Sequence, residues 1–352
     1  MTLRGASLVA VALLAGCGPR RSEPARSEPH REATSSLPRT FRWSSTGPLV
    51  SPPAGQTHLF HAVKDPSLVH FDGRFHLFAT TAGKKNGWSM LYTSFESFEA
   101  AASARPVHLG ELPALRGYHC APQVFFFRPE RKWYLVFQSG QPQYSTSDDL
   151  TKPDSWSEPR DFFPRIPAAV ANDAGGGNWL DFWVICDEPR CFLFFTNDGG
   201  AFYRSETDIA RFPQGFSEPV LALRDTKEAL YEASATYRVK GERRFLTLVE
   251  AIGPGGTRYF RSFVADALDG AWKPLADTWD NPFAGASNVA FAPGGAWTLD
   301  VSHGELVRDG YDETLTIDPN NLRFVYQGVD PAARNVEYFD LPYRLALLTA
   351  AK

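Results

Sequence analysis

The stretch KDPSLVHFDGRFHLFATT, residues 64–81, contains two short apolar runs joined by Asp72-Gly73. Asp-Gly between apolar runs is a strong signal for a two-residue hairpin turn, because both central residues of a type I′ turn need a positive φ. The stretch therefore predicts a β-hairpin. It opens with Lys64 and Asp65, and Pro66 biases Asp65 toward an extended conformation.

Four further segments repeat this form: a polar start, an apolar strand, a tight turn and a second apolar strand. The five segments are 65–81, 121–140, 180–200, 231–251 and 287–305. Their starts are 51 to 59 residues apart, which suits one four-stranded propeller blade with its loops. The period predicts an all-β fold, a five-bladed β-propeller with four-stranded antiparallel blades. A β-sandwich has similar strand spacing but lacks this longer period.

The first residues, MTLRGASLVAVALLAGCG, have a positive charge at Arg4 and an apolar run that is too short to span a bilayer. Leu14-Ala15-Gly16-Cys17 resembles a bacterial lipobox, so we expect a lipoprotein signal peptide over residues 1–16 and a lipid anchor at Cys17. An ordinary secretory peptide is the alternative. Residues 17–40 are rich in Ser, Glu, Pro and charge and predict a disordered tether, which leaves residues 41–352 as the propeller domain. We expect an exported protein, lipid-anchored to the cell envelope or secreted.

Composition excludes some partners. The chain has 352 residues, is 43% hydrophobic and carries a formal net charge of -4, so it shows no cationic bias toward nucleic acid. A propeller closes on itself, so we expect a monomer. Cys186 and Cys191 flank a turn, and in an oxidising compartment they can pair across a hairpin, although two unpaired strand thiols would have the same sequence pattern.

Three carboxylates stand at the starts of the first, third and fourth repeats: Asp65, Asp181 and Glu232. The innermost strand of each blade lines the central channel, so these side chains are predicted to converge at one mouth. Like charges in proximity raise one another's pKa, which keeps one acid protonated while another stays ionised. Hydrolysis of a glycosidic bond needs such a pair. Aromatic side chains stack on sugar rings, and the candidates are Trp88, Trp179, Trp183 and Tyr311, although most Trp residues of this chain are expected in the core.

These residues, together with APQVFFF, DFWVICDE, YEASATYRVKG, FLTLVEA, RYFRSF and SHGELVRDGYDETLTIDPNNLRFVYQG, resemble glycoside hydrolase family 62. Members of this family are α-L-arabinofuranosidases that remove arabinose side chains from arabinoxylan. The resemblance runs from about residue 40 to residue 330 and also implies a five-bladed propeller.

The resemblance implies a role for each carboxylate. Asp65 becomes the general base that activates water, and Glu232 the general acid that protonates the xylan oxygen. Asp181 raises the pKa of the acid and orients the arabinose. The family inverts configuration, so the Asp65 and Glu232 carboxyls are expected to lie about 6.5 to 9.5 Å apart, with room for a water.

Supporting residues follow from the same resemblance. Substrate contacts are implied for Lys64, Gln123, Arg258 and Asn288, each with the alternative of a strand-end hydrogen bond. Tyr311 is implied to form the pocket rim. No cofactor is required for the chemistry, but relatives carry a calcium ion near the axis with a histidine close by. That role falls to His303, although a satisfied core histidine is the competing interpretation, since calcium prefers oxygen ligands.

The chain departs from the family pattern in two places. YHCAPQ carries His119 and Cys120, and FQSGQPQYS lacks a Trp that some relatives have after the Gln. Both changes bear on substrate preference. Two alternatives remain: a family 43-like arabinosidase or xylosidase, and a non-catalytic glycan-binding surface lipoprotein, which would not need all three carboxylates.

Overall fold

The computed structural model describes residue 2 and residues 36–53, 60–83, 87–173 and 178–351. The expected signal peptide, Cys17 and most of the expected tether lie outside the described residues. The compact unit starts at Ser36, five residues before the expected boundary, because Leu37 is already buried in the main hydrophobic cluster. Among the described residues, none of the helices has the length and hydrophobicity of a bilayer span.

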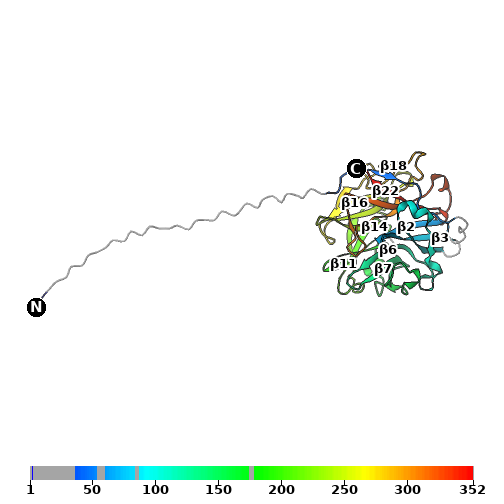
Figure 1. The fold of residues 1–352 in the computed structure, drawn as a ribbon. Coiled ribbons are helices and arrows are strands. Elements are labelled where there is room, and N and C mark those ends of the chain that lie inside the picture. Colours follow the sequence, from blue (N-terminus) through cyan, green and yellow to red (C-terminus); the bar gives the residue numbers. More distant parts are fainter. Residues whose placement is uncertain (1, 3–35, 54–59, 84–86, 174–177, 352) are drawn as a thin grey trace. The chain divides into compact units, whose positions relative to one another are not determined.

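Five sheets, each built on four antiparallel strands, surround a central axis and form a five-bladed propeller (Figure 1). The first three blades follow the chain in order. Blade one consists of β2 (Ala62–Phe71), β3 (Arg74–Gly83), β4 (Gly87–Phe95) and β5 (Val107–His108). Blade two consists of β6 (Cys120–Phe127), β7 (Lys132–Gln138), β8 (Pro142–Ser147) and β9 (Arg160–Asp161). Blade three consists of β10 (Leu180–Asp187), β11 (Arg190–Thr196), β12 (Ala201–Asp208) and β13 (Val220–Arg224).

The last two blades each have an extra strand. Blade four is β14 (Glu232–Val239), β15 (Phe245–Ile252), β16 (Arg258–Ala265) and β17 (Lys273–Ala276), with β20 (Thr316–Ile317) beside β14; blade five is β19 (Ser302–Leu306), β21 (Arg323–Gly328), β22 (Arg344–Ala350) and β1 (Trp43–Ser45), with β18 (Val289–Phe291) outermost. Short helices lie in the connections: η1 (Phe98–Ser103), η2 (Leu109–Glu111), η3 (Pro113–Leu115), η4 (Pro153–Ser155), α1 (Ala168–Ala171), η5 (Pro254–Gly256), η6 (Pro331–Ala333) and η7 (Tyr338–Asp340).

The predicted hairpin signals form the predicted turns. Asp72 and Gly73 have φ values of 48° and 72° and join β2 to β3 directly, since Phe71 pairs with Arg74. This is the conformation that the Asp-Gly dipeptide favours. Cys186 and Cys191 pair across the β10–β11 hairpin and form a disulfide, which resolves the alternative left open by the sequence.

In the fifth repeat the predicted inner strand is wrong. Residues 289–291 form β18 at the outer edge of blade five, where they pair in parallel with β1, and the inner strand is β19. The blade is completed by β1, whose Trp43 pairs with Ala350 near the other end of the chain. Trp43 is fully buried and donates its indole N–H to Phe283 O at 2.5 Å. The two ends of the domain therefore close the ring of blades together.

The segment between β19 and β21 crosses the far ends of the inner strands. Backbone N–H groups donate to it from blades two, three and four in turn: Phe126 N to Tyr311 O (2.8 Å), Cys186 N to Glu313 O (2.8 Å) and Lys240 N to Ile317 O (3.0 Å). Phe126 and Cys186 lie near the C-terminal ends of β6 and β10, and Lys240 directly follows β14. The segment thus occupies one end of the channel, and the starts of the inner strands lie at the other.

Candidate active site

A β-bulge near the start of each inner strand builds the site. Pairing with the next strand shifts register between Lys64 and Ser67, Cys120 and Gln123, Leu180 and Trp183, Glu232 and Ala235, and Ser302 and Gly304. In four of the five bulges one residue has a positive φ: Asp65 (46°), Ala121 (49°), Asp181 (57°) and Ala233 (55°). Non-glycine residues rarely adopt this conformation, and it often occurs at functional sites, where a bulge re-aims a side chain.

The bulges reveal which residues are equivalent around the ring. Asp65 and Asp181 occupy the same position in blades one and three, and His303 occupies it in blade five. Glu232 stands one residue earlier, at the position that Lys64 takes in blade one, because Glu232 pairs with Glu250 as Lys64 pairs with Thr80. The repeat therefore predicted the convergence correctly, but the acid and the two aspartates are not in the same register.

Four of the five bulges are tied to a neighbouring blade through a backbone N–H. Asp65 N donates to Gln327 Oε1 (2.7 Å), Ala121 N to Thr80 Oγ1 (2.7 Å), Ala233 N to Asp181 Oδ2 (2.6 Å), and His303 N to Glu250 Oε2 (2.7 Å). Each acceptor is a side chain of the preceding blade in the ring. Contacts between blades, rather than within one blade, therefore set the positions of the site residues.

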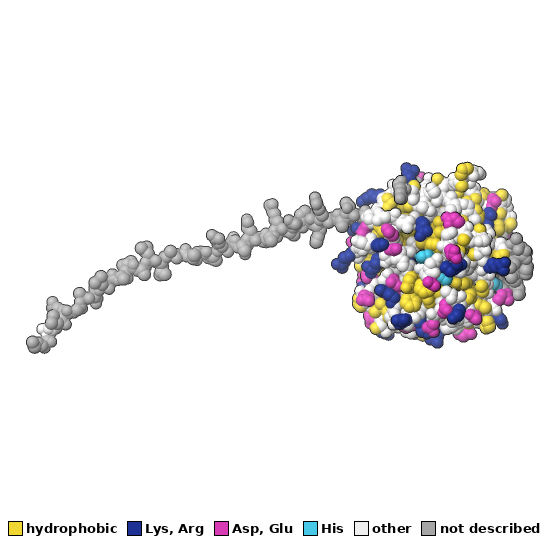
Figure 2. Space-filling model, viewed as in Figure 1, with side chains coloured by type: hydrophobic (Ala, Val, Ile, Leu, Met, Phe, Trp, Pro, Cys, Tyr) yellow, Lys and Arg dark blue, Asp and Glu magenta, His cyan; other side chains and the backbone are white. Residues whose placement is uncertain are grey.

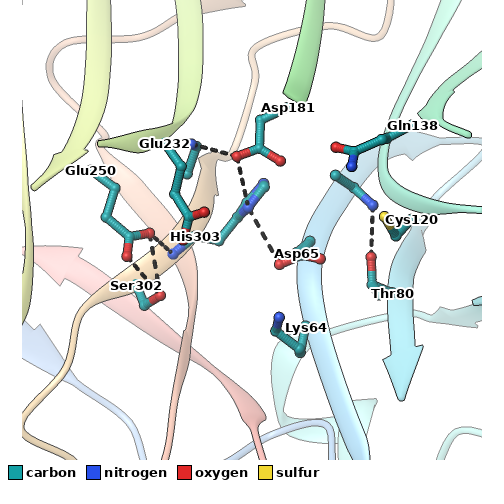
Figure 3. Close-up of polar contacts among 12 residues, drawn as sticks. Lys64, Asp65, Thr80, Cys120, Gln138, Asp181, Glu232, Glu250, Ser302 and His303 are labelled. Carbon is teal, nitrogen blue, oxygen red and sulfur yellow. Dashed lines mark hydrogen bonds and ion pairs between the residues drawn. The ribbon is translucent and has the colours of Figure 1, made fainter. Parts of the chain in front are cut away.

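His303 lies between the two aspartates (Figure 3). Its Nδ1 is 3.3 Å from Asp65 Oδ1 and 3.9 Å from Asp181 Oδ2. Burial acts to raise the pKa of Asp65, but the charges of Lys64 and His303 outweigh burial and lower that pKa. Burial raises the pKa of Asp181, and the negative charge of Asp65 adds to this effect. Asp65 is thus the carboxylate that stays ionised.

Glu232 has the opposite character. Burial raises its pKa well above the usual range, and the charges of Glu250 and Asp181 raise it further. Arg258 Nη1 donates to Glu232 Oε1 (3.2 Å) and to Glu250 Oε1 (2.9 Å), and its guanidinium lies 4.4 Å from the Tyr231 ring centroid. One site therefore holds a carboxylate with a lowered pKa and a carboxylic acid with a raised pKa.

Glu250 is a site residue that sequence reasoning missed. It is 0% exposed and accepts hydrogen bonds from Ser302 Oγ (3.0 and 3.2 Å) and from His303 N. A lone carboxylate in the apolar run Phe245–Ile252 was the available signal, because a buried strand position rarely holds a charge without a partner.

Lys64 borders the site together with an aromatic group. Its Nζ donates to the Tyr338 hydroxyl (3.0 Å) and lies 5.4, 4.9 and 5.2 Å from the ring centroids of Trp88, Tyr338 and Tyr343. Burial acts to lower the pKa of Lys64, but Asp65 and the tyrosines outweigh burial and raise it. Tyr338 and Tyr343 come from the connection between β21 and β22 and from its end, which no repeat or motif marked in the sequence.

Three expected substrate contacts lie elsewhere. Gln123 is 0% exposed, and its amide is satisfied by Val184, whose N–H donates to Oε1 and whose carbonyl accepts from Nε2, both at 2.7 Å. Asn288 binds loop backbone beside the outer strands of blade five. Tyr311 packs on Phe71, at the far end of the channel. For Gln123 and Asn288 the strand-end alternative holds, and Tyr311 is not at the rim with the carboxylates.

Two of the expected stacking residues belong to the core. Trp179 is buried and packs edge-on against Phe182 and Phe195. Trp183 is also buried, and its indole N–H donates to Thr236 O (2.8 Å), which links blades three and four. Trp88 alone of the four candidates lies with the site, beside Lys64.

The protein side chains around His303 do not by themselves form a calcium site. Calcium takes six to eight oxygen ligands as a rule, and within residues 36–53, 60–83, 87–173 and 178–351 no three His, Cys, Asp or Glu side chains form a metal-binding group. Nδ1 of His303 already faces two carboxylates. The arrangement matches a histidine that pairs with acids.

The surface in view has no dominant charge. Figure 2 shows basic and acidic side chains interspersed over the visible face, consistent with the net charge of -4. This mixture differs from the continuous basic surface expected of a nucleic-acid-binding protein.

Comparison with known proteins connects this geometry to a family. The model of glycosyl hydrolase family 62 matches residues 42–349. The chain is 48% identical to the catalytic domain of a Coprinopsis cinerea family 62 α-L-arabinofuranosidase, covering 90% of this chain and 98% of that chain, with a TM-score of 0.86. It is 43% identical to a Podospora anserina α-L-arabinofuranosidase solved with cellotriose, covering 90% and 99%, also with a TM-score of 0.86.

A longer relative matches over part of its length. The chain is 40% identical over 323 residues to α-L-arabinofuranosidase C of Cellvibrio japonicus. The match covers 91% of this chain and 48% of that protein, so the chain spans about half the length of this curated relative.

Proposed function

The chain belongs to glycosyl hydrolase family 62, and from this premise we propose that it is an inverting α-L-arabinofuranosidase that releases arabinose side chains from arabinoxylan. The observation that carries the proposal is the pair formed by Asp65, whose pKa is lowered, and Glu232, whose pKa is raised, in one site. Hydrolysis of a glycosidic bond needs one ionised and one protonated carboxyl group at the same time.

The reaction proceeds in one displacement. Glu232 gives its proton to the glycosidic oxygen as the bond from that oxygen to the anomeric carbon breaks. Asp65 takes a proton from a water whose oxygen bonds to the anomeric carbon from the opposite face. The products are arabinose with inverted configuration and the unsubstituted xylan oxygen as a hydroxyl. The proton on Asp65 and the charge on Glu232 then return to their starting states through solvent.

The remaining residues position this pair. Asp181 accepts the N–H of Ala233, so it holds the backbone beside Glu232 and raises the pKa of the acid. His303 and Lys64 keep Asp65 ionised. Arg258 holds Glu232 and Glu250. We assign Lys64, Arg258 and Trp88 to substrate contact, since Arg258 pairs with Glu232, Lys64 acts on the charge of Asp65, and Lys64 lies over the Trp88 ring.

The test is sugar release by the full-length chain. Arabinoxylan and debranched arabinan are incubated separately with the protein, and released sugars are identified by chromatography. Arabinose from arabinoxylan alone is the expected result. Release from debranched arabinan would favour the family 43-like activity, and no release from either substrate would favour a glycan-binding protein. Glu232→Gln removes the acid with little change in volume and is expected to abolish release without unfolding.

Early proton NMR tests the stereochemistry. An inverting enzyme must produce β-arabinofuranose before mutarotation. An initial α product would show retention and would remove Asp65 as a base acting on water.

We also propose that the protein is exported and anchored through a lipid on Cys17. The lipobox-like Leu14-Ala15-Gly16-Cys17 supports this proposal. The test is expression of the full chain in a bacterial host, with the membrane and soluble fractions compared by immunoblot. Cys17→Ala is expected to move the protein out of the membrane fraction, and an unchanged distribution would contradict the anchor.

A further inference from the structure

Tyr118 is a large exposed residue at the site that the mechanism above does not use. It is 41% exposed and lies just before β6. Its hydroxyl accepts hydrogen bonds from Gln138 Nε2 (2.9 Å) and from the Cys120 thiol (3.4 Å), and its carbonyl accepts one from Ser139 Oγ (3.0 Å). Blade two therefore holds both ends of this residue in place while one side of the ring is open to solvent.

Tyr118 stands next to the active site. Cys120 is the blade-two equivalent of Lys64 and Glu232, since each is the last paired residue before its bulge. Figure 3 shows Cys120 and Gln138 on the side of Asp65 and Asp181 opposite Glu232. The charge of Asp181 also contributes to the raised pKa of Tyr118. The Tyr118 hydroxyl thus lies within electrostatic reach of the reacting groups.

Three aromatic rings form a row along this edge of the site. The ring centroid of Trp88 lies 6.2 Å from that of Tyr118 and 6.2 Å from that of Tyr338. Lys64 Nζ lies over both Trp88 and Tyr338. We call Tyr118, Trp88 and Tyr338 the aromatic row. Both ends of the row are exposed: Tyr118 at 41% and Tyr338 at 48%.

The hydrogen bonds of Tyr118 determine what its hydroxyl offers. Burial raises the pKa of the Cys120 thiol to about 12, so at neutral pH the thiol keeps its proton and donates it. Burial and Cys120 also raise the pKa of Tyr118, so the phenol stays protonated. Its oxygen already accepts from two donors, which uses both lone pairs. Its O–H proton remains to be donated to a third group.

We propose that Tyr118 is a specificity-determining residue that stacks on a sugar unit of the xylan backbone and donates a hydrogen bond to it. The inference rests on the proposed function and names how the substrate's backbone is recognised. Sugar rings present apolar C–H faces beside hydroxyl groups, which suits an aromatic ring with a polar tip. Asp65 and Asp181 are buried, so they suit the smaller arabinose side chain, whereas the aromatic row is open enough for a polymer.

The first experiment measures xylotriose binding to the full-length chain by calorimetry. Tyr118→Ala is expected to raise the Kd about tenfold or more, because the stacking surface and the hydrogen bond are both lost. Tyr118→Phe keeps the ring and is expected to raise the Kd by about threefold to tenfold. Tyr311→Phe is the matched control, because Tyr311 is also a half-exposed tyrosine (37%) but lies at the far end of the channel. The Kd of this variant for xylotriose is expected to stay unchanged.

Kinetics separate recognition from chemistry. For arabinoxylan, Tyr118→Ala is expected to raise KM with kcat nearly unchanged, as for the loss of an interaction that is equally strong before and during the reaction. An unchanged melting temperature shows that the variant is folded. A wild-type Kd and KM in Tyr118→Ala would overturn the inference while arabinose release still supports the proposed function. Wild-type protein that releases arabinose but does not bind xylotriose would also overturn the inference. Absence of arabinose release from wild type would instead overturn the proposed function.

Discussion

Glu250→Gln tests the electrostatic basis of the active site. Glu250 is fully buried, and each of its oxygens accepts two hydrogen bonds: Oε1 from Arg258 and Ser302, and Oε2 from His303 N and Ser302. Glutamine has nearly the same shape but replaces one acceptor oxygen with an NH₂ donor. The substitution therefore leaves either Arg258 or the His303 N–H without its acceptor.

The cost in stability follows from these contacts. Removing one partner of a buried ion pair costs about 3 to 5 kcal/mol of unfolding free energy, because the other charge stays buried without compensation. We expect a loss of this size for Glu250→Gln, measured by chemical denaturation. The charge of Glu250 opposes ionisation of Glu232, so the substitution also removes this repulsion from the ionised state of Glu232.

The effect on activity has a definite sign. Glu232 acts as an acid only while protonated, so activity is lost as pH rises through its pKa. Burial raises that pKa, the charges of Glu250 and Asp181 raise it further, and Arg258 lowers it. Glu250→Gln removes one raising charge and leaves Arg258 facing Glu232 alone. The pKa of Glu232 falls, and the alkaline limb of the kcat/KM profile moves to lower pH.

The assay is arabinose release from arabinoxylan as a function of pH, with Glu305→Gln as the control. Glu305 is also fully buried and pairs with Arg308 (2.6 Å), but it lies deeper in the channel, where Leu68 N donates to it (3.2 Å). Glu305→Gln is expected to lose similar stability without moving the alkaline limb. An alkaline limb that stays in place or moves to higher pH in Glu250→Gln would refute the assignment of Glu232 as the acid held protonated by its neighbours.

Three further outcomes follow from the fold and the site. Gln123→Ala removes the side-chain partner of the N–H and the carbonyl of Val184 in the core. We expect the unfolding free energy, measured by denaturation, to fall by about 2 to 6 kcal/mol, and KM to stay unchanged. A raised KM at full stability would instead make Gln123 a substrate contact. Trp43→Ala creates a cavity beside the closing strand β1 and is expected to lower the unfolding free energy by about 3 to 5 kcal/mol. A decrease of less than about 1 kcal/mol would contradict the closing role of β1. Burial raises the pKa of Cys120 to about 12, and only the thiolate reacts with iodoacetamide. At pH 8 we therefore expect iodoacetamide to label Cys120 only after denaturation. Rapid labelling of the native protein, detected by mass spectrometry, would disprove this.

Much of the fold was predictable because the signals are local. Asp72-Gly73 specifies its own turn, and the repeat period follows from one hairpin per blade. The fifth blade was not predictable in this way. Its inner strand Ser302–Leu306 is short, and its fourth strand comes from the other end of the domain. The pairing of Trp43 with Ala350 joins residues far apart in the chain, and no local pattern encodes such a contact.

The sequence by itself determined the inner strands of the first four blades and the convergence of Asp65, Asp181 and Glu232, because residues near the start of each repeat meet around one axis. Only the tertiary structure decided which polar residues face the opening. Gln123 was predicted to contact the substrate but binds Val184 in the next blade. No sequence pattern predicted a role for Glu250, which accepts hydrogen bonds from both Arg258 and His303. The physical reason is that the partners of a buried polar group lie on neighbouring blades, so its role depends on contacts between segments distant in sequence.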